Sequence, residues 1–153
     1  MEAILKYSGL ISVLLVIIGW AVIYRNAVKI ATRAETKSLM DDLFRIFDSI
    51  ESLSVDYWLS GRKNRIDSDE FTLLFNAKLL TLNSRLEQLE HRKVDVSEVD
   101  LSKLAELITI DCEDVDRKSD SDKRARVQLI LDHINKSTVG LYSNFQHANK
   151  PVH

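Results

Sequence analysis

Residues 7–24 read YSGLISVLLVIIGWAVIY. This stretch carries no charged side chain, and the residue that follows it is Arg25. A helix of this length rises about 27 Å, which is close to the thickness of the hydrocarbon core of a bilayer. The stretch therefore predicts a transmembrane helix at residues 7–24. It indicates where the chain resides and leaves its activity open.

The two edges of this span indicate its orientation. Amphipathic aromatic rings, which favour the headgroup region, stand at both edges; they are Tyr7, Trp20 and Tyr24. Four basic residues follow the span at every fourth position, namely Arg25, Lys29, Arg33 and Lys37. Because Lys and Arg are enriched on the cytoplasmic side, we expect residues 1–6 outside and the rest of the chain in the cytoplasm, in a single pass through the inner (plasma) membrane. The same four residues either contact anionic headgroups or only set the topology.

A cleaved signal peptide is the alternative interpretation of the same stretch. A signal peptide has a basic segment before the apolar run and an A-x-A-like cleavage site after it. Here Glu2 offsets Lys6, and the chain after Trp20 reads AVIYR. We therefore favour an uncleaved anchor.

The composition of the remaining chain indicates a small helical domain. About 125 residues follow the span, enough for one hydrophobic core. Charged residues make up 29% and the net charge is −2, so the bulk charge does not indicate a nucleic-acid partner. The chain has four glycines and one proline, which favours helices. The one cysteine, Cys112, has no intrachain partner for a disulfide, which suits a reducing compartment.

Three segments carry mainly apolar residues at heptad-like spacings of three and four, the pattern of a helix-packing seam. The first segment has Leu39, Leu43, Ile46, Ile50, Leu53 and Tyr57, the second has Phe71, Phe75, Leu79, Leu82, Leu86 and Leu89, and the third has Val127, Leu131, Ile134, Thr138, Leu141 and Phe145. Leu74 and Leu80 are expected to widen the second stripe. Such seams can close within one chain or between chains.

These seams predict an all-α fold. The first helix is expected to run from about Leu10 to Leu59, through a basic juxtamembrane stretch at residues 25–38. An antiparallel bundle or coiled-coil hairpin follows over residues 39–148, with a flexible tail at 149–153. A short helix is expected at 101–112 and a last helix at 123–147.

The expected helix ends carry recognisable signals. Gly61 suits a helix C-terminus, and Asp67 suits an N-cap with Glu70 three residues later. The charge-dense segment 111–122 is interpreted as an exposed turn, with Asp120 or Asp122 capping the last helix.

The sequence motifs predict no catalytic, cofactor-binding or metal site. The basic turn 62–65 suits either an acidic partner or plain solvation, and we favour solvation. The acidic run after Asp111 lacks the glycine and spacing of a calcium-binding loop, and no histidine forms a Glu-x-x-His motif. We expect no nucleic acid and no small-molecule substrate.

The leading functional hypothesis is a membrane-anchored, non-enzymatic interaction protein or accessory regulatory subunit. It would hold a partner protein, or copies of itself, at the lipid bilayer through helix–helix contacts. The layout is similar to that of small accessory subunits, regulators, and phage-related or defence components, an analogy of architecture alone. The alternative is a signal-relay module that switches between two bundle packings. An unrecognised enzyme ranks third.

Overall fold

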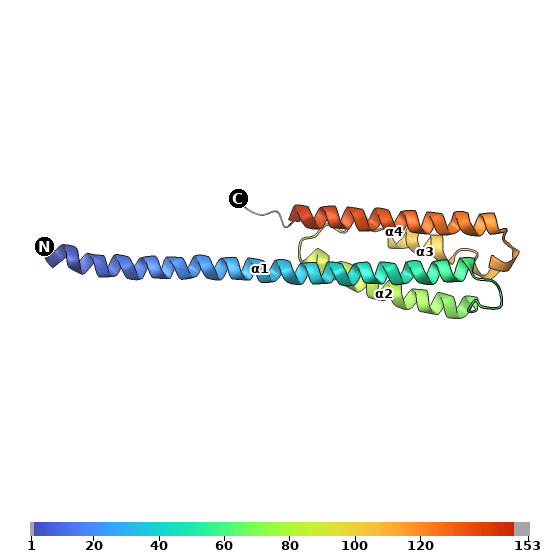
Figure 1. Cartoon of the computed structure of the whole chain (residues 1–153), viewed down its shortest axis with the longest axis horizontal. Helices are drawn as coiled ribbons and strands as arrows, with labels where there is room; N and C mark the ends of the chain where they lie inside the picture. Colours follow the sequence, from blue (N-terminus) through green and yellow to red (C-terminus); the bar gives the residue numbers. More distant parts are fainter. Residues whose placement is uncertain (1, 149–153) are drawn as a thin grey trace. The chain divides into compact units, whose positions relative to one another are not determined.

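The computed structural model describes residues 2–148, with side chains from residue 12 onward. The chain divides into an N-terminal unit, Met1–Lys37, and a C-terminal unit, Ser38–His153. Its elements are α1 (Glu2–Leu59), α2 (Ser68–His91), α3 (Leu101–Thr109), the short 3₁₀ helix η1 (Cys112–Arg117) and α4 (Asp120–Ala148) (Figure 1). The described residues form no strand, which confirms the predicted all-α class.

The N-terminal unit consists of the first part of α1, and its apolar side chains are exposed. Those from Val13 to Ile23 that are large and apolar have 50% to 71% of their surface exposed. Further along, the Thr32 hydroxyl donates to the Val28 carbonyl at 2.9 Å and the Thr36 hydroxyl to the Thr32 carbonyl at 2.8 Å. These bonds satisfy both hydroxyl groups within the helix itself.

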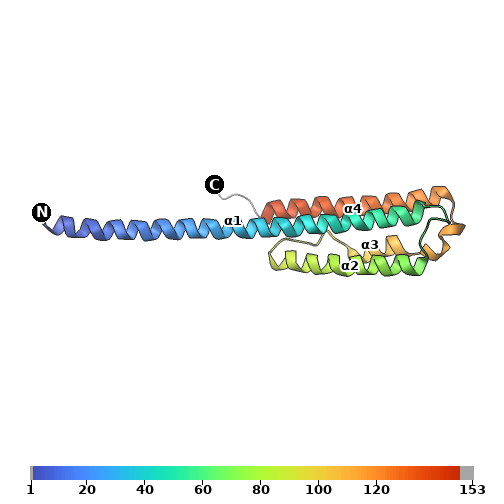
Figure 2. The same cartoon turned by 60° about the horizontal axis from the view of Figure 1, so that its bottom comes forward.

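The C-terminal unit is built around one hydrophobic core. The last part of α1 lies beside α2 and α4 in both views, and α3 packs against α2 and α4 (Figure 2). Every helix contributes to this core. Its fully buried large side chains include Met40, Leu43, Phe47, Ile50, Trp58, Phe71, Phe75, Leu82, Leu89, Leu104, Ile108 and Ile130. The apolar area they withdraw from water is the main stabilising contribution in this unit.

The buried stripe of α1 is wider than the predicted seam. Leu43, Ile50 and Tyr57 are buried as members of that seam, whereas Leu39, Ile46 and Leu53 are half-buried. Met40, Phe47, Ser54 and Trp58 are also buried, although the seam omits them. Neighbours on more than one side cover a broader face than the narrow line of a two-helix seam. The buried Ser54 hydroxyl donates to the Ile50 carbonyl at 2.7 Å.

Most of the seam residues on α2 and α4 are buried as well. The buried ones are Phe71, Phe75, Leu82, Leu86 and Leu89 on α2 and Val127, Ile134, Leu141 and Phe145 on α4, while Leu79, Leu131 and Thr138 are half-buried. Ile130 and Ser137 are buried in addition.

The prediction that Leu74 and Leu80 widen the core stripe is wrong. Leu80 is 73% exposed and Leu74 is 41% exposed. At 100° per residue, Leu80 points about 160° away from the buried Leu82. The apolar character of α2 therefore continues onto its outer side.

Both ends of α2 are closed by hydrogen bonds. Asp67 is the N-cap, as predicted, and its Oδ1 accepts from the amides of Asp69 at 2.7 Å and Glu70 at 3.1 Å. At the other end Lys93 has φ 65°, and its amide donates to the Glu90 carbonyl at 2.8 Å. The Val94 amide donates to the Leu89 carbonyl at 3.1 Å, which completes a Schellman motif.

The segment after α3 departs from the prediction in three ways. The helix ends at Thr109 rather than residue 112, because Ile110 is extended with ψ 128° and Asp111 is left-handed with φ 58°. The expected exposed turn contains η1, which buries Cys112 and Val115. The cap of the last helix is Ser119, whose Oγ accepts from the Asp122 amide at 3.1 Å, so neither expected aspartate is the cap.

The connecting loop, residues 92–100, is held on α4. The Asn144 amide Nδ2 donates to the Asp95 carbonyl at 3.0 Å, and His133 Nε2 lies 3.0 Å from the Asp100 carbonyl. Between them, a Cβ added at Gly140 would lie 2.8 Å from the Glu98 Cβ, so only glycine permits this close approach. The loop thereby covers one side of α4 and fixes the position at which α3 begins.

Candidate functional site

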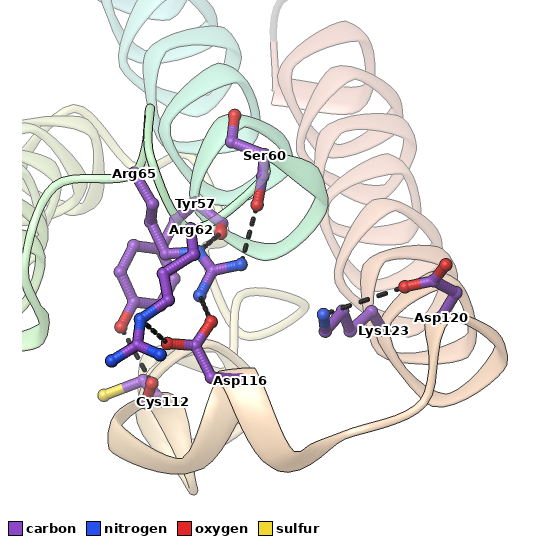
Figure 3. Close-up of polar contacts among 8 residues, drawn as sticks. All are labelled: Tyr57, Ser60, Arg62, Arg65, Cys112, Asp116, Asp120 and Lys123. Atoms are coloured by element: carbon purple, nitrogen blue, oxygen red, sulfur yellow. Dashed lines mark hydrogen bonds and ion pairs between the residues drawn. The ribbon is translucent and has the colours of Figure 1, made fainter.

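The most connected group of side chains in the C-terminal unit lies where α1 turns into α2. We call it the tip cluster, and it consists of Tyr57, Ser60, Arg65, Cys112 and Asp116 (Figure 3). Tyr57 comes from α1, Ser60 and Arg65 from the turn, and the other two from η1. The cluster joins segments about fifty residues apart in the sequence, so the core must form before these groups can meet.

Arg65 is the centre of the tip cluster. Its side chain is 6% exposed, Nε donates to the Tyr57 carbonyl at 2.8 Å, and Nη2 donates to the Ser60 carbonyl at 2.6 Å. Tyr57 is in the last turn of α1 and Ser60 directly follows the helix, where carbonyls lack a partner from a continuing helix. A guanidinium group therefore caps α1. Gly61 lies two residues beyond the end of α1, as expected of a glycine at a helix C-terminus, and it does so without a left-handed conformation, since no described glycine has a positive φ.

Tyr57 is a protonated hydrogen-bond donor in this cluster. Its ring stacks on Phe71 with centroids 3.7 Å apart, and its hydroxyl donates to the Cys112 carbonyl at 2.7 Å. Burial raises the pKa of Tyr57 to about 12; Cys112 and Asp116 act in the same direction, and Arg65 opposes them. A phenol with this pKa anchors η1 and is a poor acid or base at neutral pH.

Asp116 balances the arginines of the basic turn. Its carboxylate accepts from Arg65 Nη1 at 2.6 Å and lies 3.4 Å from Arg62 Nε. The Arg62 side chain is 86% exposed, so its ion pair is weak, whereas the Arg65 side chain is 6% exposed and is also held by two carbonyls. Two of the three cations of residues 62–65 are thus matched by a carboxylate of the same chain. This pairing lowers the charge available to an acidic partner or a phosphate.

Other aspartates of the charge-dense segment 111–122 also form ion pairs with nearby basic residues. Lys118 Nζ lies 2.8 Å from Asp111, and its hydrogen bond is the main reason that the pKa of Asp111 is lowered. Arg117 pairs with Asp114 at 2.8 Å, and Lys123 with Asp120 at 3.7 Å (Figure 3). In residues 12–148 no three His, Cys, Asp or Glu side chains gather in a way that could hold a metal ion.

Trp58, which follows Tyr57 in α1, links this helix to α4. Its side chain is fully buried, and the Arg126 guanidinium of α4 lies 5.5 Å from the ring centroid. Arg126 also donates to the Leu107 carbonyl of α3 at 3.3 Å. The indole Nε1 has no acceptor among the described residues. Sequence reasoning missed both Trp58 and Arg65, because the groups that surround them come from distant parts of the chain.

A shallow groove runs between α1 and α2. It has a volume of about 340 Å³ and is lined by Ile46, Ser49, Leu74, Ala77, Lys78 and Thr81. The lining mixes apolar and polar residues with a single charge, that of Lys78, and it offers no converging set of catalytic groups. A groove of this kind suits an apolar side chain of another helix better than a polar substrate.

The residues expected at the membrane lie on exposed positions of α1. Trp20 is 71% and Tyr24 is 70% exposed. The side chains of Arg25, Lys29, Arg33 and Lys37 are also exposed. The side chain of Tyr7 lies outside the described residues, as does the tail at 149–153. Within the part of the chain that the structure describes, one helix is long and apolar enough to cross a membrane, judged by length and composition.

Comparison with models of known protein families found no match, and comparisons with curated proteins and with solved structures found none either.

Proposed function

We propose that the chain is a single-pass membrane protein that acts through protein–protein contacts rather than catalysis. Residues 7–24 cross the inner (plasma) membrane, and the C-terminal unit is held at its cytoplasmic face. The partner is another protein or a further copy of the chain. The observation that carries this proposal is the run of exposed apolar side chains from Val13 to Ile23.

The free energy gained by burying these side chains favours an apolar environment around them. Fully burying one valine, leucine or isoleucine side chain is worth about 1.5 to 3 kcal/mol, and this run presents about eight of them to solvent. A helix that is apolar all round is stable in a bilayer or inside a protein assembly. The exposed cations from Arg25 to Lys37 follow it directly and suit the anionic cytoplasmic leaflet.

The C-terminal unit supports a binding role over a catalytic one. Its buried polar groups, such as Arg65 and Tyr57, are used in bonds that fix the turns. The groove between α1 and α2 and the exposed leucines on the outer side of α2 offer surfaces for another helix. Together these features suit an adaptor that presents a rigid helical surface near the bilayer.

Topology labelling tests the anchor and its direction. Cys112 is 5% exposed and therefore a poor native probe, so the reporter is Ser121→Cys, at an exposed position near the start of α4. In intact cells, a membrane-impermeant thiol reagent should leave Ser121→Cys unlabelled and should label Glu2→Cys. Labelling of Ser121→Cys before lysis would overturn the orientation. Release of the wild-type chain from membranes by alkaline carbonate would overturn the anchor itself.

Affinity capture tests the interaction role. The full chain, solubilised in mild detergent, should retain a partner in fixed stoichiometry, or should associate with a differently tagged copy of itself. A matched control replaces residues 7–24 with an unrelated single-pass helix of the same orientation. A tether keeps its partner in this variant, whereas a relay module needs its own helix and loses its response.

A further inference from the structure

Four exposed cations without a carboxylate partner follow the apolar run of α1. We divide them into an inner pair, Arg25 and Lys29, and an outer pair, Arg33 and Lys37. No ion pair joins any of them to a carboxylate within residues 12–148, whereas the basic turn at 62–65 is largely matched by Asp116. The chain has no acidic residue from position 3 to position 34, so the charge of the inner pair is uncompensated.

The exposed apolar side chains indicate which cations lie at the level of the headgroups. Tyr24 is 70% exposed, and Ile30, which is 71% exposed, is the last large apolar residue before the stretch ATRAETK at 31–37. The headgroup layer on each side of a bilayer is about 5 to 7.5 Å thick, which is the rise of about three to five helical residues. Because Tyr24 favours the inner edge of that layer, Arg25 and Lys29 fall within it and the outer pair falls beyond it.

We propose that the inner pair binds the phosphate of an anionic phospholipid, whereas the outer pair stays in water. This inference deepens the proposed membrane anchor and rests on it. Arg25 and Lys29 are one turn apart and differ by about 40° around α1, which is continuous here (Figure 1), so they are neighbours on its surface. Helical side chains lean toward the N-terminus, which for this helix is toward the bilayer.

The chemistry of the inner pair suits a phosphate that carries a net charge. A guanidinium group can donate two parallel hydrogen bonds to phosphate oxygens, and an ammonium group adds a compact positive charge beside it. A zwitterionic headgroup carries its own cation, which repels both groups. We therefore expect the inner pair to prefer an anionic headgroup such as phosphatidylglycerol over phosphatidylcholine.

Screening separates the two pairs of cations. Measured along the helix from Tyr24, Lys29 lies about 7.5 Å away and Lys37 about 20 Å away. A helix tilt of about 40°, the upper end of the usual range, shortens these heights by only about a quarter. The potential of a charged leaflet falls off over about 8 Å at physiological salt, so the inner pair experiences roughly four times the potential that the outer pair does.

Lipid selectivity of the full chain tests the proposal. The chain is reconstituted in mixed phosphatidylcholine and phosphatidylglycerol vesicles, and electron paramagnetic resonance of spin-labelled forms of each lipid gives the ratio of their association constants at the protein surface. We expect a preference of at least about twofold for phosphatidylglycerol, averaged over the lipids around the helix. A wild-type ratio near one would overturn the proposal.

Two double variants that remove the same charges form a matched comparison. Arg25→Gln with Lys29→Gln should bring the ratio close to one, whereas Arg33→Gln with Lys37→Gln should keep most of the preference. Equal losses in the two variants would overturn the division into an inner and an outer pair. High salt should lower the wild-type ratio, and a ratio that does not change with salt would contradict an ionic contact.

Flotation of the same vesicles in alkaline carbonate separates this inference from the anchor on which it rests. The wild-type chain and both double variants should float with the vesicles, because residues 7–24 are unchanged in all three. Release of the wild-type chain would refute the anchor and the headgroup site together. A chain that floats but shows no preference for phosphatidylglycerol would refute the headgroup site alone.

Discussion

The two units of the chain use the same apolar residue types in opposite ways. In the N-terminal unit Leu15 and Ile18 are more than half exposed, whereas in the C-terminal unit Leu43 and Ile50 are fully buried. The difference lies in the pattern. Residues 13–23 of the first unit are apolar on every side of the helix, whereas the helices of the second unit have apolar and polar sides at helical spacing. A uniform apolar surface requires an apolar environment, while a striped one can be covered by other helices of the same chain.

The largest expected effect is that of removing the N-terminal unit, which should separate the C-terminal unit from the membrane. A chain that starts with Met followed directly by Ser38 keeps every buried residue of the hydrophobic core from Met40 onward. We expect it to remain in the supernatant after high-speed centrifugation and to be mainly helical by circular dichroism. A shortened chain that pellets with membranes would mean that the C-terminal unit itself binds them. A disordered spectrum would mean that the core depends on residues 2–37.

A charge placed in the core should unfold the C-terminal unit, whereas the same charge on the exposed side of α2 should not. Leu43→Asp buries an unpaired carboxylate at a fully buried position, and we expect it to cost about 4 kcal/mol or more. Leu80→Asp is the matched control, because Leu80 is 73% exposed, and its effect on stability should stay within about 0.5 kcal/mol. Chemical denaturation of both variants under the same conditions measures this difference. Similar midpoints would contradict the placement of Leu43 in the core.

Substitution of the two arginines of the turn, Arg65 and Arg62, should lower the stability of the C-terminal unit by different amounts. Arg65→Ala leaves the carbonyls of Tyr57 and Ser60 without their donor, and we expect a loss of about 1 to 3 kcal/mol. Arg62→Ala removes an exposed ion pair with the same carboxylate and should cost at most about 0.5 kcal/mol. Thermal unfolding followed by circular dichroism distinguishes them. Equal shifts would mean that the ion pair with Asp116, and not the helix cap, is what stabilises the turn.

These arginines also show which features the sequence could predict. Local signals were sufficient for the Asp67 cap, because its partners Asp69 and Glu70 are two and three residues away. They were insufficient for Arg65, whose partner Asp116 is 51 residues away and becomes a neighbour only after the core has formed. No local rule distinguishes Arg65 from Arg62 before folding.

The predicted seams show the same limit within a single helix. Their spacing identified the buried side of α1 through Leu43, Ile50 and Tyr57, yet it omitted Phe47 and Trp58. A seven-residue frame describes contact with one neighbour, and the width of the stripe depends on how many neighbours there are. At the start of α4 three residues, Ser119, Asp120 and Asp122, each had cap chemistry. Which of them became the cap was decided by the path of the chain out of η1.

The buried phenol of Tyr57 makes the C-terminal unit sensitive to alkaline pH. Its pKa is raised to about 12 from an ordinary value near 10, so the folded state favours the protonated form. The stabilisation is therefore present in full below pH 10 and is lost as the pH rises from 10 to 12, at up to about 1.4 kcal/mol per pH unit. Tyr57→Phe should lack this part of the decline. Unfolding free energies of both proteins between pH 8 and 11 provide the measurement, and identical slopes would mean that other groups account for the whole effect.

The smallest expected effect is a gain in stability at the end of α2. Lys93 adopts the left-handed conformation, with φ 65°, at the position of the Schellman motif where glycine is usual. This conformation costs a residue with a Cβ about 1 kcal/mol, and glycine avoids most of that cost while losing more entropy on folding. We therefore expect Lys93→Gly to stabilise the C-terminal unit by about 0.5 kcal/mol in chemical denaturation. Asp111→Gly is the informative contrast, because Asp111 has φ 58° but also pairs with Lys118 at 2.8 Å. At Asp111 the relief of backbone strain is offset by the loss of the ion pair. A larger gain in stability for Asp111→Gly than for Lys93→Gly would therefore show that the ion pairs around η1 contribute little to the fold.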